Sequence, residues 1–225
     1  MKILQINTID NLGGAARLAW QLFQGYQQLG YESSFVVAAK YSHHPTVVGM
    51  AEVLPNHAWF QACMALRASL QAFNGKRLGA GRLQLLLTKL SRPLQLITDP
   101  IWRIRSQLGH EDFHAPATWH LLRKFQPDII HCHNLHGSGF GRGYFDLRAL
   151  AWLSRRCPIV LSLHDAWLLS GHCAHSFECD RWRTGCGSCP DLTIPPPIPR
   201  DATAYNWQRK QQIYARSRLY VATPC

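Results

Sequence analysis

The sequence predicts an α/β fold built on a parallel β-sheet. Residues 2–39 contain, in order, an apolar strand, a glycine-bearing loop, an amphipathic helix and a second strand, which is the pattern of a βαβ unit. Two further apolar, β-prone runs, residues 129–132 and 159–163, each follow a short helical segment. Because strands joined through a helix run parallel, these observations together favour one parallel sheet.

The first forty residues define the βαβ unit. We expect a strand over residues 2–7, a loop over residues 8–14 and a second strand over residues 34–39. Between them, apolar residues at spacings of three and four predict a helix over residues 15–29, which Gly30 ends. The apolar positions of this helix are Ala15, Leu18, Ala19, Leu22, Phe23, Tyr26 and Leu29.

The later elements follow from shorter patterns. We expect a short helix over 117–125, a strand over 129–132, a helix over 146–155, a strand over 159–163, a basic helix over 202–217 and a last short strand over 219–222. Residues 195–199 predict a proline-rich linker.

Residues 59–108 form a basic insertion in this pattern. They show no clear strand, and they hold many lysines and arginines and one acidic residue, Asp99. Leucines are interspersed, and Pro93 and Pro100 break the segment into short helices. Two interpretations remain open: an amphipathic stretch that lies on an anionic membrane surface, or a solvated helical insertion whose leucines pack on the sheet.

Composition limits the class of protein. The 225 residues suffice for one large domain, and contents of 47% apolar and 16% charged residues are typical of a globular chain. The net charge of +11 favours an anionic partner, namely phosphate groups, acidic lipid or nucleic acid, although a basic surface also serves solubility alone. The first residues are not a signal peptide, and no run of about eighteen apolar residues occurs, so we expect a cytoplasmic chain.

Polar side chains follow two of the predicted strands. His164 and Asp165 come directly after strand 159–163, and His133, Asn134 and His136 follow strand 129–132. In open α/β sheets, ligands bind in the crevice outside the carboxyl ends of the strands. His164 could contact a substrate hydroxyl as a hydrogen-bond partner or proton carrier, whereas the alternative for the His164–Asp165 pair is a structural cap. His131, inside the strand, is interpreted as a core histidine.

A second candidate is the glycine pair Gly13-Gly14, which lies between a strand and a helix N-terminus. Glycines let backbone N–H groups approach an anion, and the helix dipole favours phosphate there; a plain tight turn is the alternative. Arg17, one turn into the helix, could pair with the same phosphate. The loop lacks GxGxxG and no acidic residue ends the second strand, which disfavours a dinucleotide-dependent oxidoreductase.

Four cysteines with the spacing C-x5-C-x6-C-x2-C follow His164: Cys173, Cys179, Cys186 and Cys189. Four thiolates match tetrahedral zinc, and the closing C-x2-C pair is a usual zinc knuckle, whereas the first pair is looser. Such a zinc would be structural, ordering the cysteine-rich loop of residues 171–192. His172 and His175 are alternative ligands, and reduced thiols or disulfides remain alternative states.

These motifs together resemble the N-terminal half of family 4 glycosyltransferases, most closely the bacterial exopolysaccharide-type members. The resemblance rests on GGAAR (13–17), PDIIHCHNLHG (127–137), LSLHDAWLLSGHC (161–173), CDRWRTGCGSCPDL (179–192) and RDATAYNWQRK (200–210). It covers nearly the whole chain apart from the basic insertion.

The resemblance implies a GT-B fold, in which two Rossmann-like domains, each a parallel sheet with helices on both faces, meet across a cleft. Residues 1–225 would form the first, acceptor-side domain. By position, Gly13 and Gly14 would lie near the donor phosphates with Arg17 as a companion, His164 would be the active-site histidine, and Asp165 would orient it. Transfer from a nucleotide sugar to a saccharide or lipid-linked acceptor would retain the anomeric configuration, and no catalytic metal is expected.

The family's second domain, with its paired-glutamate donor site, has no counterpart in this sequence. We therefore expect little transferase activity without a C-terminal GT-B domain in cis or in trans. The resemblance, with the basic insertion, also predicts peripheral contact with the inner face of an anionic membrane. The rival interpretation is a zinc-stabilised basic module that binds nucleic acid; it is disfavoured because the basic residues gather in residues 59–108 and not around the cysteines.

Overall fold

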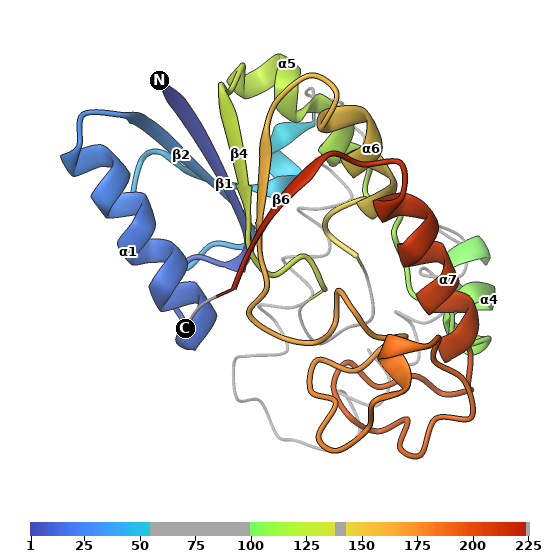
Figure 1. The fold of residues 1–225 in the computed structure, drawn as a ribbon. Coiled ribbons are helices and arrows are strands. Elements are labelled where there is room, and N and C mark those ends of the chain that lie inside the picture. Colours follow the sequence, from blue (N-terminus) through green and yellow to red (C-terminus); the bar gives the residue numbers. More distant parts are fainter. Residues whose placement is uncertain (55–99, 138–142, 224–225) are drawn as a thin grey trace, which may run out of the picture. The chain divides into compact units, whose positions relative to one another are not determined.

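The computed structural model of the chain describes residues 1–54, 100–137 and 143–223, and its ribbon is drawn in Figure 1. A six-stranded parallel sheet forms its centre, with the strand order β3-β2-β1-β4-β5-β6. The predicted parallel α/β fold is therefore confirmed. The strands are β1 Lys2–Ile9, β2 Glu32–Ala39, β3 Val47–Gly49, β4 Ile129–Cys132, β5 Ile159–Ser162 and β6 Leu219–Ala222.

The helices of the described residues are mostly short. They are α1 Gly14–Gln28, α4 Pro100–Gln107, α5 Leu121–Phe125, α6 Leu150–Leu153 and α7 Thr203–Tyr214. Single 3-10 turns occur at η1 Met50–Val53, η2 Pro116–His120, η3 Leu147–Ala149 and η4 Arg181–Arg183. The helix predicted over 146–155 is thus a 3-10 turn followed by one α-helical turn, and Asp146 caps it by accepting a hydrogen bond from the Arg148 N–H at 3.0 Å.

The direction of the chain reverses between β1 and β4. From β1 the chain moves through α1 to β2 and β3 on one side, and from β4 it moves to β5 and β6 on the other side. Right-handed crossovers then place α1 and the later helices on opposite faces of the sheet. Because the segments that follow these two paired strands lead to opposite sides, they leave a crevice at the carboxyl ends of the strands, which is where ligands of open α/β folds bind.

Helix α1 packs on β1 and β2 and closes one side of the core (Figure 1). Its residues Ala16, Ala19 and Phe23 are buried at helical spacing, as the apolar pattern predicts. Phe23 meets Phe35 of β2 with ring centroids 5.5 Å apart. Burial of aromatic side chains of this size anchors the helix, and with it the loop that enters the helix at Gly13.

The basic insertion is described only at its end. The chain divides into two compact units, one of Leu54–Ile104 and one of Met1–Val53 with Arg105–Cys225, which contains the whole sheet. Residues 59–99 of the predicted insertion lie outside the described residues. Helix α4 begins at Pro100, a residue that the first turn of a helix tolerates. In the described part of the chain, no helix combines the length and the apolarity that crossing a membrane requires.

Candidate active site

A cleft of about 500 Å³ opens at the point where the strand order reverses. Its size lies in the range that binds small molecules. Three segments line it: the end of β1 with the start of α1, the turn after β4, and a proline-rich wall. The lining residues are Asn7, Thr8, Ile9, Leu12, Gly13, Gly14, Ala15, Ala16, Asn134, His136, Gly137, Ala174, Pro195, Pro196 and Pro197.

The glycine corner sits at the N-terminus of α1. Gly13 has a φ of 89°, a backbone conformation that strains any side chain with a Cβ, and the helix begins at Gly14. No side chain caps this helix end, and its first turn has no acidic residue. The partial positive charge of the helix end, exposed next to two glycines, therefore faces the cleft and favours an anion.

Side chains of β1 hold the turn after β4 in place. The Asn134 N–H donates to Asn7 Oδ1 at 3.1 Å, and the Thr8 hydroxyl donates to the carbonyls of Asn134 at 3.2 Å and His136 at 2.9 Å. The Asn7 amide also donates to the Ile9 carbonyl at 2.7 Å. These bonds join the end of β1 to the turn after β4 and fix the backbone of both walls of the crevice.

His136 lines the cleft as a cation. Its Nε2 donates to Asp165 Oδ2 at 3.0 Å and its Nδ1 donates to the Gly137 carbonyl at 3.2 Å. A histidine donates from both nitrogens only when it is protonated. Burial alone would lower the pKa of His136, but the hydrogen bond and charge of Asp165 outweigh burial and raise this pKa above its ordinary value. Asp165 also accepts a hydrogen bond from the Trp167 N–H at 2.9 Å.

His164 joins a different network, whose other members are His133 and Gln5. The His133 Nδ1 lies 3.0 Å from the His164 Nε2, and the His133 Nε2 lies 3.0 Å from the Gln5 amide nitrogen. Burial, and then the neighbouring histidines, lower the pKa of His133 to about 2, and burial also lowers the pKa of His164. Both rings are therefore neutral near pH 7, unlike His136.

His131 is a core histidine, as the sequence predicts. Its Nδ1 lies 3.1 Å from the Tyr26 hydroxyl, its Nε2 lies 2.9 Å from the Ser162 hydroxyl, and its ring stacks on His133 at a centroid distance of 4.2 Å. Burial lowers its pKa to about 4. It contributes to the wall behind the network and does not line the cleft.

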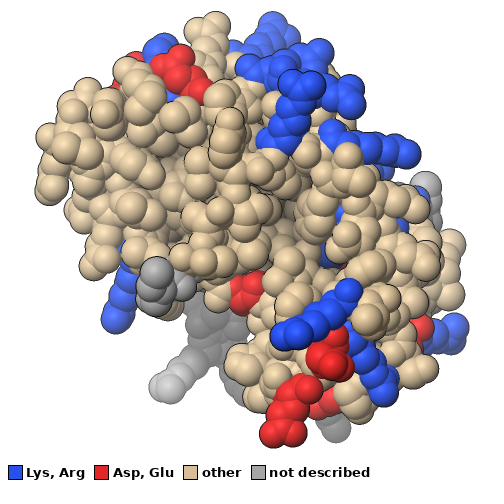
Figure 2. All heavy atoms as spheres, in the orientation of Figure 1, with Lys and Arg blue, Asp and Glu red and all other residues tan. Residues whose placement is uncertain are grey.

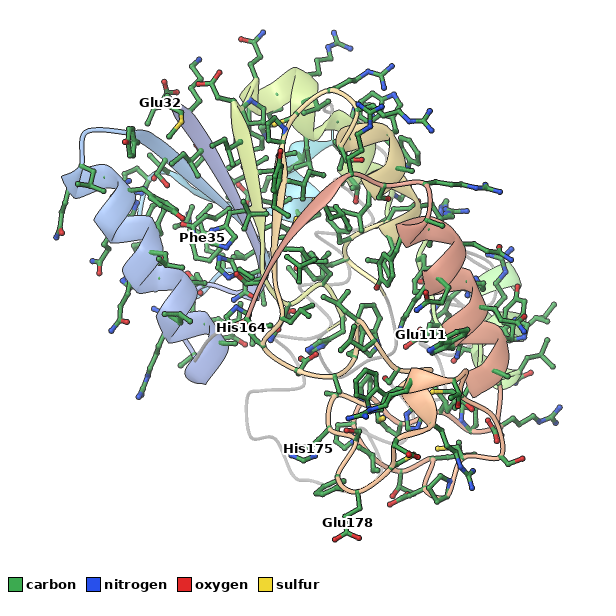
Figure 3. All side chains as sticks on the ribbon, in the orientation of Figure 1. Glu32, Phe35, Glu111, His164, His175 and Glu178 are labelled. Carbon is green, nitrogen blue, oxygen red and sulfur yellow. The ribbon has the colours of Figure 1, made fainter. Side chains whose placement is uncertain are left out.

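The structure brings most of the predicted site residues together. Gly13, Gly14, Asn134 and His136 line one cleft, and Figure 3 shows His164 at the carboxyl ends of the strands. His133, His164 and Asp165 are tied to this region by hydrogen bonds but do not line the cleft. Arg17 is exposed on α1, away from the cleft lining.

Three details of the site differ from the sequence analysis. Asp165, which was expected to orient His164, makes its hydrogen bonds with His136 and Trp167. Residues 195–199, predicted as a linker, supply a wall of the cleft through Pro195–Pro197. Asn7 and Thr8 were not predicted as site residues; their signal is two adjacent polar residues near the carboxyl end of a mostly apolar strand.

The cysteine-rich loop surrounds a second, much smaller cavity of about 20 Å³. Cys173, Cys179, Cys186 and Cys189 all line it, and so does His172. All described cysteines are free, so they form no disulfide among themselves. Within residues 1–54, 100–137 and 143–223, no three His, Cys, Asp or Glu side chains already stand in the arrangement of a formed metal site.

A buried lysine fastens the loops after β5 to α7. The Lys210 ammonium contacts Glu111 Oε2 at 2.8 Å, donates to the carbonyls of Trp167 at 2.7 Å and Ser170 at 3.0 Å, and lies 3.9 Å from the centroid of the Trp167 ring. Only 1% of its side chain is exposed. Lys210 thereby fixes the segment that leads from Asp165 into the cysteine-rich loop.

Comparison with known proteins identifies the family. The sequence model described as Glycosyltransferase Family 4 matches residues 12–223, which is nearly the whole chain. A protein of Escherichia coli (strain K12), provisionally named colanic acid biosynthesis glycosyl transferase WcaC, is 24% identical over an alignment 229 residues long that covers 95% of this chain and 45% of that protein. The chain thus spans less than half of this relative's length. The parallel sheet of this chain, and the cleft where its strand order reverses, agree with the family match. The chain belongs to glycosyltransferase family 4.

Proposed function

We propose that this chain is the acceptor-side domain of a retaining GT-B glycosyltransferase, which transfers a sugar from a nucleotide-sugar donor to a saccharide or lipid-linked acceptor in polysaccharide biosynthesis. The observation that carries this proposal is the cleft at the carboxyl ends of β1 and β4, which joins Gly13, Gly14, Asn134 and His136. The name of the Escherichia coli relative supports the polysaccharide assignment.

The residues of the cleft suit the charge that this reaction develops. The nucleoside diphosphate gains negative charge as the bond between the anomeric carbon of the donor sugar and the diphosphate oxygen breaks. The uncapped N-terminus of α1 at Gly13 and the protonated ring of His136 would stabilise an anion in the cleft without a divalent ion. His164, neutral and adjacent, would contact the transferred sugar or the acceptor hydroxyl.

The GT-B resemblance implies that transfer needs a second Rossmann-like domain, because a cleft closed from two sides excludes water and positions the donor. The test is a transfer assay with radiolabelled nucleotide sugars and lipid-linked saccharide acceptors. We expect transfer when a C-terminal GT-B domain is fused to or mixed with the chain, and little transfer without it; the part of WcaC outside the match can be tried as such a partner. Full transfer by the chain alone would refute the two-domain requirement.

His164→Ala and Gln28→Ala in the same fusion test the site itself. His164→Ala should lower transfer at least about 100-fold. Gln28 is exposed on α1, so its substitution should leave the rate unchanged. If no nucleotide sugar supports transfer by the fusion, or if His164→Ala transfers at the rate of the control, the proposed function is wrong.

We propose further that the enzyme works in the cytoplasm, peripherally attached to an anionic membrane. Exposed cations precede β4, β5 and β6, so they gather at the amino edge of the sheet, opposite the cleft: Arg123, Lys124, Arg155, Arg156, Arg216 and Arg218. Figure 2 shows lysines and arginines gathered over α5 and α6. Charges on the edge away from the cleft could hold a membrane while the site stays open.

Vesicle co-sedimentation tests this attachment. Phosphatidylcholine vesicles with about a third phosphatidylglycerol should pull down the chain at low salt and release it as salt rises. Arg155→Glu with Arg156→Glu should weaken binding, whereas Arg181→Glu with Arg183→Glu, a matched pair of exposed arginines in the cysteine-rich loop, should not. Equal binding to neutral vesicles, or tighter salt-sensitive binding to oligonucleotides, would contradict the membrane proposal.

The remaining cofactor proposal is a structural zinc ion held by Cys173, Cys179, Cys186 and Cys189. The shared cavity of about 20 Å³ supports it, because roughly 10–15 Å³ holds a water molecule and a zinc ion is smaller. Metal binding would draw the four sulfurs inward. Because η4 is the only regular turn within the described residues 171–192, a metal ion would stabilise a segment that has little secondary structure of its own. Elemental analysis should find one zinc per purified chain, less in Cys186→Ser and an unchanged amount in Cys225→Ser. Metal-free protein with reduced thiols or disulfides would end this proposal.

A further inference from the structure

A chain of hydrogen bonds joins three residues at neighbouring strands: Gln5, His133 and His164. Gln5 lies in β1, His133 follows β4, and His164 follows β5, and these strands are adjacent in the sheet. Gln5 and His133 are fully buried, so water does not offer them alternative partners. The partner at one end of this hydrogen-bond series can only accept, and it therefore determines which group donates in each bond.

This accepting partner is the carbonyl of Ala19. It lies 3.2 Å from the Gln5 amide nitrogen and can only accept, so the Gln5 NH₂ group must face it. The opposite amide orientation would place two carbonyl oxygens against each other. The second hydrogen of the same NH₂ group points at His133 Nε2, 3.0 Å away. An amide nitrogen does not accept a hydrogen bond, so His133 Nε2 must be the acceptor and carries no proton.

The protonation of the next ring follows. A neutral His133 without a proton on Nε2 carries it on Nδ1, and this N–H donates to His164 Nε2 at 3.0 Å. His164 Nε2 is then also an acceptor, so the proton of neutral His164 sits on Nδ1. In the described part of the chain, His164 Nδ1 makes no hydrogen bond, which leaves this N–H free for a substrate.

We propose that Gln5 and His133 are positioning residues that hold His164 in its Nδ1-protonated form, so that His164 meets the substrate as a hydrogen-bond donor and not as a base. This inference rests on the proposed function for the role of His164, whereas the hydrogen-bond order rests on the geometry alone. A base role would need an unprotonated nitrogen facing the substrate, and the unprotonated Nε2 is taken by His133. The partner that fits is an electron-rich oxygen of the sugar or of the acceptor.

Ring-nitrogen NMR of the full chain with ¹⁵N-labelled histidine tests the proton positions directly. In the wild-type spectrum, His133 and His164 should both carry the proton on Nδ1. Gln5→Glu should reverse the order, because a carboxyl group accepts from His133 Nε2, which frees His133 Nδ1 to accept from a proton on His164 Nε2. Gln28→Glu adds the same charge on the exposed face of α1 and should change neither ring. If Gln5→Glu fails to fold, the wild-type spectrum alone decides.

Transfer assays on the two-domain fusion test the role. Gln5→Glu should lower kcat by roughly tenfold or more with a smaller change in KM, while Gln28→Glu transfers at the wild-type rate. A wild-type His164 protonated on Nε2 would overturn the proposal. A Gln5→Glu fusion in which His164 carries its proton on Nε2 but which still transfers at the wild-type rate would also overturn it. If the wild-type fusion transfers nothing, the proposed function is lost, and the spectra still decide the proton positions.

Discussion

Gly13 shows how one residue ties the fold to the proposed chemistry. Its φ of 89° would strain an alanine, although no atom lies within 4 Å of where a Cβ would be. We expect Gly13→Ala to cost about 1–2 kcal/mol in free energy of unfolding and to tilt the entry of α1, which weakens anion binding. Gly14 also has open space but no positive φ, so Gly14→Ala is the matched control for stability.

Urea unfolding gives the free energy of unfolding of the two variants, and titration with a nucleoside diphosphate gives their affinity for the anion. The stability loss should appear in Gly13→Ala and not in Gly14→Ala, which gains slightly as a better helix former. Equal stability and equal binding in both variants would show that the turn at Gly13 does not shape the cleft.

The His136–Asp165 pair gives a second prediction at this scale. Burial is the largest influence on the pKa of His136 and lowers it, whereas the hydrogen bond and the charge of Asp165 oppose burial, so Asp165→Asn should lower this pKa. His136 would then be neutral at pH 7, and the cleft would lose a positive charge. Titration of the His136 ring by NMR measures this change, with Asp191→Asn, an exposed aspartate, as the control. An unchanged pKa of His136 in Asp165→Asn would contradict the assigned pairing.

Among the secondary-structure elements, α7 depends on one buried charge. Lys210→Met removes the ion-pair partner of Glu111 and two hydrogen bonds to backbone carbonyls, so the buried carboxylate loses its ion pair. Breaking a buried pair in this way costs about 3–5 kcal/mol. Urea unfolding should show this loss in Lys210→Met and almost none in Gln211→Met, an exposed neighbour on the same helix.

The double variant Lys210→Met with Glu111→Gln separates charge from packing. Neutralising Glu111 should recover part of the stability lost in Lys210→Met, because the unpaired charge is gone. If the double variant is as unstable as the sum of both single changes, the ammonium acts through its backbone contacts and not through Glu111.

The elements with long apolar patterns were predicted well. The period of α1 and the apolar runs of β1, β2, β4 and β5 place these elements within a few residues of where the structure has them. Strand β3 was missed because three residues at a sheet edge carry no period. The 3-10 turns at η2 and η3 were included in predicted α-helices, because side-chain spacing over three to five residues does not separate the two helix types.

At the scale of the whole molecule, buried neutral histidines should make stability depend on pH. Burial lowers the pKa of His131 to about 4 and of His133 to about 2, whereas the unfolded chain binds a proton near pH 6.5. Between pH 6.5 and 4 the unfolded state therefore binds more protons, and the free energy of unfolding falls as pH falls, by up to about 1.4 kcal/mol per pH unit for each histidine.

His131→Gln isolates one of these contributions. Its free energy of unfolding should depend less steeply on pH than that of the wild type between pH 6.5 and 4, while His175→Gln, an exposed substitution, should not change the slope. Chemical unfolding at several pH values gives the comparison. A parallel pH dependence in His131→Gln and the wild type would mean that His131 is protonated in the folded chain.

The site as a whole was only partly predictable from sequence. Residues that follow strands, such as Asn134 and His164, could be placed at one edge because parallel strands end together. The sequence could not predict which of these residues share a hydrogen bond, because the pairing of Asp165 with His136 depends on the conformations of the turns after β4 and β5. Gln5 was hidden for another reason: a polar residue in the middle of a buried strand gives no sign of its partner.

The central claim is that ligand binds at the carboxyl ends of β1 and β4, where the strand order reverses, and NMR mapping of a nucleoside diphosphate on the ¹⁵N-labelled chain tests it most directly. Titration with UDP and with GDP should shift the amide signals of Gly13, Gly14, Asn134 and His136 together, and Gly13→Ala should weaken the response. Shifts confined to the cysteine-rich loop or to the basic edge before β4 and β5, with the glycine corner unchanged, would contradict the claim.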